Sequence, residues 1–96
     1  MAFVFYFGYE TPEIADQNDR HGWDLEASQA VVIDTADEQA AMEWGCEVAE
    51  RFLAEKYGVS WRAGEYARRV QPVASEPHAE SLDRITVGQF PDFSRW

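Results

Sequence analysis

The hydrophobic positions of residues 36–57 repeat with the period of an α-helix. At about 100° per residue, small and apolar side chains fall on one face: Ala41, Gly45, Val48, Ala49, Phe52 and Leu53, with Met42 and Trp44 at the margins. The opposite face holds Glu43, Glu47 and Glu50, spaced i, i+4 and i+7, with Arg51 beside them. The pattern predicts one amphipathic helix that packs closely against a sheet and turns its glutamates to solvent.

Both ends of this helix are marked by residues that favour helix termini. Thr35 followed by Glu38 fits a capping box, in which side chains accept the free N–H groups of the first turn. Lys56 lies in the last turn, where a cation is favoured, and Gly58 is suited to the left-handed conformation that ends a helix. We therefore expect a helix over residues 36–57 with Thr35 as its N-cap.

Two strands are predicted before the helix. Residues 3–9 alternate aromatic residues with other largely apolar ones, which is typical of a strand covered on both faces. Gly8 in this run indicates a bulge or a close backbone approach. Residues 27–34 predict a second strand, and neighbours in sequence most simply pair antiparallel.

The segment between these strands, residues 10–26, is polar. Only Ile14, Trp23 and Leu25 are available to anchor it, and residues 11–13 are suited to a single helical turn. A connection of this length in a small domain is more often functional or mobile than structural. We expect an acidic loop here.

The pattern after Gly58 is ambiguous. Residues 59–62 look extended, with Val59 and Trp61 on one face. Residues 63–71 fit a strand by alternation or a short helix by spacing. A short helix is favoured because the Ala, Glu and Arg residues here are poor strand formers.

The last quarter of the chain predicts a linker, a strand and a tail. Residues 71–83 form the linker, and residues 83–88 form a third strand with Ile85 and Val87 inward. The tail places Phe90, Phe93 and Trp96 three residues apart, so that it covers apolar surface where it docks. We expect one α+β domain over residues 1–96: a small two-layer sandwich with a three- to four-stranded, mostly antiparallel sheet and one long helix across one face.

The charge of the chain is strongly acidic and unevenly distributed. The net charge is −10, and residues 1–50 hold twelve acidic side chains against one base, whereas residues 51–96 hold six acids and seven bases. Such a field repels nucleic acid and anionic membranes and attracts basic partners. The alternative is that the acidity serves only to keep the protein soluble.

The oxygen ligands of the acidic loop invite a comparison with calcium sites. Counting from Asp16, Asn18 stands at position three, but Arg20 takes position five and Ala27 takes the place of the closing glutamate. The spacing fails, so a solvated loop is expected and neither a metal nor another cofactor. His21 and His78 are far apart in sequence and are expected to be surface residues.

No pattern of a catalytic nucleophile or a phosphate-binding loop is present in the sequence. Cys46 lies beside Glu47 in a carboxylate-rich helix, and negative charge disfavours the thiolate. Acid–base catalysis by two of the glutamates is the weakest alternative, and we expect no enzymatic activity. The arginines Arg62, Arg68, Arg69 and Arg84 are expected to pair with acids and not with phosphates.

An exposed tryptophan surrounded by charge is a common interface anchor, and Trp23 fits this description. The alternative is that Trp23 folds back on its own loop. The candidate partner-binding residues are Asp16, Asp19, Trp23, Asp24, Glu26, Glu43, Glu47 and Glu50.

These features predict an acidic protein–protein interaction module, an inhibitor that masks a basic surface of a partner such as a nucleic-acid-binding enzyme. In size and charge the chain resembles anti-CRISPR proteins, other DNA mimics and nuclease immunity proteins. The alternative is a housekeeping accessory or oligomerising domain, a homodimer formed through the aromatic first strand or the tail. The first ten residues lack the pattern of a signal peptide, and a single cysteine fits a reducing compartment, so we expect a cytoplasmic protein.

Overall fold

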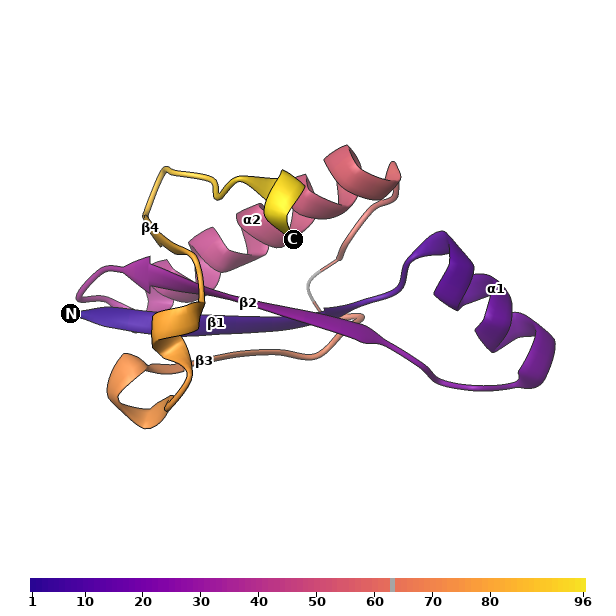
Figure 1. Cartoon of the computed structure of the whole chain (residues 1–96), viewed down its shortest axis with the longest axis horizontal. Helices are drawn as coiled ribbons and strands as arrows, with labels where there is room; N and C mark the ends of the chain where they lie inside the picture. Colours follow the sequence, from indigo (N-terminus) through magenta and orange to yellow (C-terminus); the bar gives the residue numbers. More distant parts are fainter. Residues whose placement is uncertain (63) are drawn as a thin grey trace.

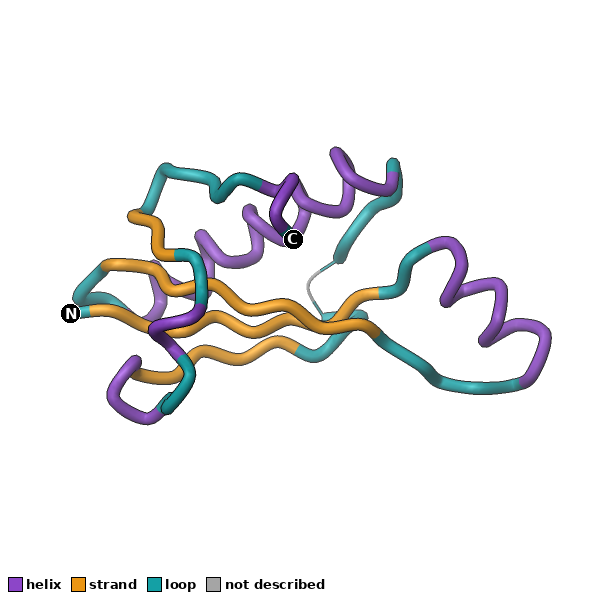
Figure 2. Tube along the Cα trace, viewed as in Figure 1, coloured by secondary structure: helices purple, strands orange, loops and turns teal. Residues whose placement is uncertain are grey.

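A computed structural model describes residues 1–62 and 64–96. It contains a four-stranded mixed sheet with the order β3-β1-β2-β4 and two α-helices. The elements are β1 (Ala2–Tyr9), α1 (Pro12–His21), β2 (Ala27–Asp34), α2 (Glu38–Tyr57), β3 (Arg68–Pro72) and β4 (Arg84–Thr86). Figure 1 shows α2 along one face of the sheet, and Figure 2 shows the strands side by side. The predicted α+β sandwich with one long helix is confirmed.

The aromatic strand β1 lies in the middle of the sheet. It pairs antiparallel with β2 along its whole length, from Ala2 opposite Asp34 to Tyr9 opposite Ala27, and antiparallel with β3 on its other side. Every residue of β1 is buried except Tyr6, which is half-buried. β4 pairs parallel with the end of β2, so the sheet is mixed. The predicted two-sided burial of this strand is confirmed.

The main core lies between the sheet and α2. The buried face of the helix consists of the six residues that the helical period predicts: Ala41, Gly45, Val48, Ala49, Phe52 and Leu53. They pack on Phe3, Phe5, Phe7 and Tyr9 of β1 and on Val31 and Ile33 of β2. Phe93 and Trp96 of the tail also pack against this core, so the tail docks on the domain.

The other face of the sheet is covered at one end only. Residues 73–82 form two short 3₁₀ turns, Val73–Ser75 and Ala79–Ser81. A second, smaller core forms here from Ala2, Val4, Val32 and Ala79. Tyr6 donates its hydroxyl hydrogen to Glu76 of this segment.

Two expectations about helices were wrong. The N-cap of α2 is Asp37, whose carboxylate accepts from Gln39 N at 3.0 Å, whereas the Thr35 hydroxyl accepts from Asp37 N at 3.2 Å in the turn before it. A carboxylate at the positive end of the helix dipole makes a charge-assisted cap. The segment expected as a loop contains α1, a helix of 10 residues.

The short helix favoured for residues 63–71 was also wrong. β3 occupies Arg68–Pro72, and its pairing with β1 outweighs the weak strand propensity of its arginines. Ala63 lies outside the described residues.

The third predicted strand is shorter than expected. β4 covers Arg84–Thr86, with Ile85 buried as predicted. Val87 is not inward but 49% exposed, because the chain has already left the sheet.

Candidate protein-binding surface

The chain from Glu10 to Glu26 leaves the sheet and returns to it as a projecting segment, which we call the acidic arm. Its helix α1 has complete caps: the Thr11 hydroxyl accepts from Ile14 N at 3.1 Å, Pro12 occupies the first turn, and Gly22 has a φ of 67°. No residue of α1 is buried. Figure 1 shows α1 beyond the end of the sheet. The helix is therefore held by its own termini and not by a hydrophobic core.

Asn18 fastens the returning part of the arm to α1. Its side-chain amide donates to Leu25 O at 2.9 Å and to Glu10 Oε2 at 3.1 Å, and its Oδ1 accepts from Leu25 N at 2.9 Å. Its carbonyl accepts from the backbone N–H groups of Gly22 and Trp23. Five hydrogen bonds at one residue give residues 22–26 a defined path without burying them.

The arm presents acidic and apolar side chains together at the surface. Asp16, Asp19, Asp24 and Glu26 are all exposed, and within residues 1–62 and 64–96 only Asp16 of these four has an ion-pair partner, Arg20 at 3.2 Å. Trp23 is 52% exposed and stacks on His21 with ring centroids 4.1 Å apart. Leu25 is 45% exposed, so it does not anchor the arm as expected; the main chain of Leu25 does. An exposed tryptophan and leucine among carboxylates suit a protein partner better than solvent alone.

The glutamates of α2 form a second acidic surface. Glu43, Glu47 and Glu50 are exposed, opposite the buried face of the helix. Gln39 donates to Glu43 Oε1 at 3.1 Å. Arg51 contacts other residues: its Nη1 lies 3.8 Å from Glu55 Oε1, and its Cζ lies 4.4 Å from the centre of the Phe90 ring. The predicted acidic face of the helix is confirmed as a surface.

The structure divides the eight candidate residues between two places. Five of them, Asp16, Asp19, Trp23, Asp24 and Glu26, lie on the acidic arm, and three lie on α2. In Figure 1, α1 and α2 extend from different parts of the sheet and do not lie side by side. A partner can therefore bind the acidic arm alone, the glutamates of α2 alone, or both surfaces at separate points.

The arginines mainly engage the protein's own acids and aromatics. Arg84 forms a bidentate ion pair with Asp34: Nη2 donates to Oδ1 at 2.6 Å, and Nε donates to Oδ2 at 2.9 Å. Hydrogen bonding to Arg84 lowers the pKa of Asp34, and the same contact raises the pKa of Arg84. Arg62 lies 3.7 Å from Glu65, and Arg69 stacks over Tyr6 at 4.4 Å.

The remaining chemistry of the surface is limited. Cys46 is half-buried, and burial raises the pKa of its thiol, which disfavours the nucleophilic thiolate. Among the described residues, no three or more His, Cys, Asp or Glu side chains gather in an arrangement suited to a metal ion. None of the helices in the described part of the chain has the length and apolar character needed to cross a membrane.

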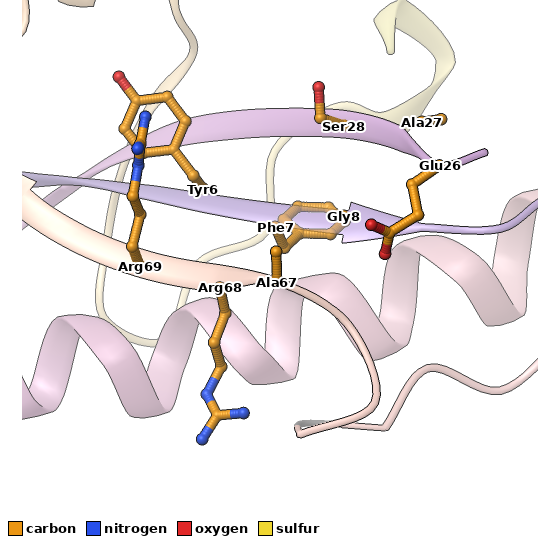
Figure 3. A pocket seen from close by; sticks show the side chains of 9 residues that line it. All are labelled: Tyr6, Phe7, Gly8, Glu26, Ala27, Ser28, Ala67, Arg68 and Arg69. Carbon is orange, nitrogen blue, oxygen red and sulfur yellow. The ribbon is translucent and has the colours of Figure 1, made fainter. Parts of the chain in front are cut away.

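The sequence singles out Gly8 but does not predict the hollow that lies over it. A hollow of about 530 Å³ lies over Gly8, on the open half of the sheet face opposite α2, and its lining includes Tyr6, Glu26, Ser28 and Arg69 (Figure 3). The hollow depends on the pairing of β3 with β1, which brings Arg69 opposite Tyr6. The interpretation of residues 63–71 as a helix could not place these side chains together.

Comparisons of the chain with protein-family models, curated proteins and solved structures found no match. Its function must therefore be argued from the surface itself.

Proposed function

We propose that this protein is an acidic protein-binding module that masks a basic surface of a partner protein. The acidic arm is the observation that best supports this proposal. Its helix α1 has both caps and no buried residue, and the arm exposes Trp23 and Leu25 among carboxylates. In this proposal the tryptophan supplies desolvated contact area and the carboxylates select a basic partner.

The charge of the arm fits this role. Residues 10–26 hold six acidic side chains and one arginine. Because the carboxylates are exposed, they attract a basic surface over roughly the 8 Å screening length at physiological salt. Binding through them should be fast and should weaken as salt rises.

The class of partner is part of the proposal. A row of carboxylates on a helix, such as Glu43, Glu47 and Glu50, replaces the phosphates of a nucleic-acid backbone on a basic protein surface. A nucleic-acid-binding enzyme is therefore the partner we propose, in a cytoplasmic role like that of anti-CRISPR or nuclease immunity proteins. The arm and α2 then contact either one large basic surface or two.

In the alternative, an oligomerising domain, self-association was expected through the first strand or the tail, and both make contacts within the chain. β1 is paired on both edges, and Phe93 and Trp96 of the tail pack on the protein's own core. The observations therefore favour the arm over these segments as the binding element.

The test is affinity capture from the source cell followed by binding measurements with the purified captured protein. One variant carries Asp16→Asn, Asp19→Asn, Asp24→Asn and Glu26→Gln; a second carries Trp23→Ala; a third carries Glu43→Gln, Glu47→Gln and Glu50→Gln. The control is Glu80→Gln, an exposed acid on the segment below the sheet.

We expect one basic, nucleic-acid-binding protein to be captured by the wild type and by the control. Both arm variants should bind it at least about tenfold more weakly, a loss of about 1.4 kcal/mol. The affinity of the wild type should fall steeply between low and moderate salt. Equal capture by all variants, or binding that does not depend on salt, would show that the acidity is only solvated surface.

A further inference from the structure

β4 covers only the end of the outer edge of β2. β4 pairs with β2 only over Val32–Asp34, although β2 begins at Ala27. Among the described residues, no strand lies along the outer side of Ala27–Val31, and Figure 2 shows β2 continuing past β4 toward α1. We call residues 27–30 the open edge.

The direction of the backbone groups on the open edge follows from one hydrogen bond. Val32 N donates to Asp83 O at 2.8 Å, on the side of β4. In a strand, every second residue directs its N–H and C=O to the same side, so Ala30 and Ser28 also direct theirs outward. Ala30 N donates a hydrogen bond to the side chain of the adjacent Gln29, with Oε1 at 3.1 Å, whereas Ser28 is exposed to solvent.

The open edge lacks the features that protect the other side of the sheet. β3 has Arg68 and Arg69 in its edge strand and ends at Pro72, which has no N–H to offer. Charged residues and proline at an edge discourage the addition of a further strand. The open edge instead has small side chains at Ala27, Ser28 and Ala30. Ser28 is exposed, whereas Ala30 is half-buried and lines a small hollow with Asp83 and Trp96.

The hollow over Gly8 adjoins the open edge at Ser28. Gly8 lies directly opposite Ser28 in the register, and both line the hollow. The Glu26 carboxylate lies over Gly8, so that a Cβ added at Gly8 would stand 3.1 Å from Glu26 Oε1. Figure 3 shows Glu26 at the end of the hollow that is away from Tyr6 and Arg69. The two arginines that line the hollow, Arg68 and Arg69, belong to β3, on the far side of β1 from the open edge. A side chain projecting from an added strand toward this face would therefore meet the Glu26 carboxylate before these guanidinium groups.

We propose that the open edge of β2 accepts an extended segment of a partner protein, and that a lysine or arginine of this segment pairs with Glu26 in the hollow over Gly8. Backbone hydrogen bonds to Ser28 and Ala30 provide the attachment, and Glu26 provides the preference for a basic segment. The inference rests on the proposed function only in that the partner is basic; it does not require Trp23 or α1.

The test uses a short synthetic peptide that alternates valine and lysine, titrated into the whole protein and followed by NMR and amide hydrogen exchange. The peptide should slow the exchange of the Ser28 N–H and shift the signals of Ala27–Ala30. Ser28→Pro removes one outward N–H and leaves the β1–β2 ladder intact, so it should fold and bind the peptide at least about tenfold more weakly. Glu26→Gln should weaken binding and make it less dependent on salt.

Controls keep the proposal testable if Ser28→Pro fails to fold. A peptide with N-methylated backbone amides cannot form the strand hydrogen bonds and should not bind, and a peptide with glutamate in place of lysine should bind more weakly than the basic one. Trp23→Ala should bind the basic peptide as the wild type does. Loss of cellular capture in Trp23→Ala with unchanged peptide binding would separate the arm from the open edge.

Several results would overturn the inference. These are the absence of Ser28 protection, equal affinity for the methylated peptide, or protection at Val70 on the β3 edge instead. Protection of Ser28 that rises with protein concentration without peptide would identify the occupant as a second copy of this chain. If the peptide does not bind but the arm variants still lose capture, only this inference fails and the proposed function stands.

Discussion

The contact between Gly45 and Phe5 gives the most exact prediction about the packing of this protein. Gly45 lies on the buried face of α2, directly over the ring of Phe5 in β1. A Cβ added at Gly45 would stand 2.3 Å from Cγ and Cδ1 of this ring, well inside the usual carbon–carbon contact of about 3.5–4.0 Å. Phe5 is fully buried, with Phe7 at 5.7 Å between ring centroids, so the ring has little room to move.

Gly45→Ala therefore sets two effects against each other. Alanine favours the helix by about 1 kcal/mol relative to glycine. Overpacking of a rigid core costs about 1–3 kcal/mol, and the depth of this overlap places the cost at the upper end, about 3 kcal/mol. We expect a net loss of about 2 kcal/mol, which lowers Tm by about 8–16 °C for a domain of this size.

Urea unfolding followed by circular dichroism measures this loss. Gly8→Ala is the matched control, because the atoms nearest to the added Cβ belong to the flexible end of Glu26, and it should cost clearly less. Phe5→Leu combined with Gly45→Ala should show a favourable coupling, since the smaller side chain relieves the overlap. A Gly45→Ala protein as stable as the wild type would refute the close packing of α2 on β1.

Three further predictions concern local contacts. Asp37→Ala should lower the free energy of unfolding by about 1 kcal/mol, whereas Thr35→Ala should cost less, because Asp37 is the N-cap; urea unfolding of both variants compares them. Asn18→Ala should speed amide hydrogen exchange at residues 22–26 while global stability stays nearly unchanged. Exchange rates at residues 22–26 equal to those of the wild type would contradict the role of Asn18 in holding this segment. The lowered pKa of Asp34 means that its ion pair with Arg84 stabilises the fold above the ordinary pKa of aspartate, and this contribution disappears as the pH falls through the folded-state pKa. The stability difference between wild type and Asp34→Asn should therefore shrink on acidification at low salt, and a difference that does not change with pH would reject the pair as its cause.

Local signals for α1 were present in the sequence and were outweighed by its polarity. Thr11, Pro12 and Gly22 are residue types that favour helix ends, and in the structure Thr11 is the N-cap and Gly22 is the C-cap of α1. Because α1 has no buried face, the hydrophobic period that identified α2 is missing, and the segment was interpreted as a loop. For exposed helices, the caps are a better guide than the apolar pattern.

The sequence pointed to the acidic residues of the arm, but it did not predict how the arm is folded. Composition alone pointed to Asp16, Asp19, Trp23, Asp24 and Glu26. The hydrogen bonds of Asn18, the stacking of Trp23 on His21 and the exposure of Leu25 depend on how the chain returns from α1. No periodic pattern encodes this return.

The sequence by itself determined the elements that supply most of the buried apolar side chains. The buried face of α2 and the covered strand β1 follow from the spacing of apolar residues, because burial selects positions at the period of each element. Tertiary structure alone decided the elements that depend on neighbours distant in sequence. β3 is a strand because the free edge of β1 pairs with it, and β4 pairs parallel because the chain returns beside the far end of β2. The open edge and the hollow over Gly8 arise from these pairings, since backbone hydrogen bonding between strands does not depend on local side-chain preference.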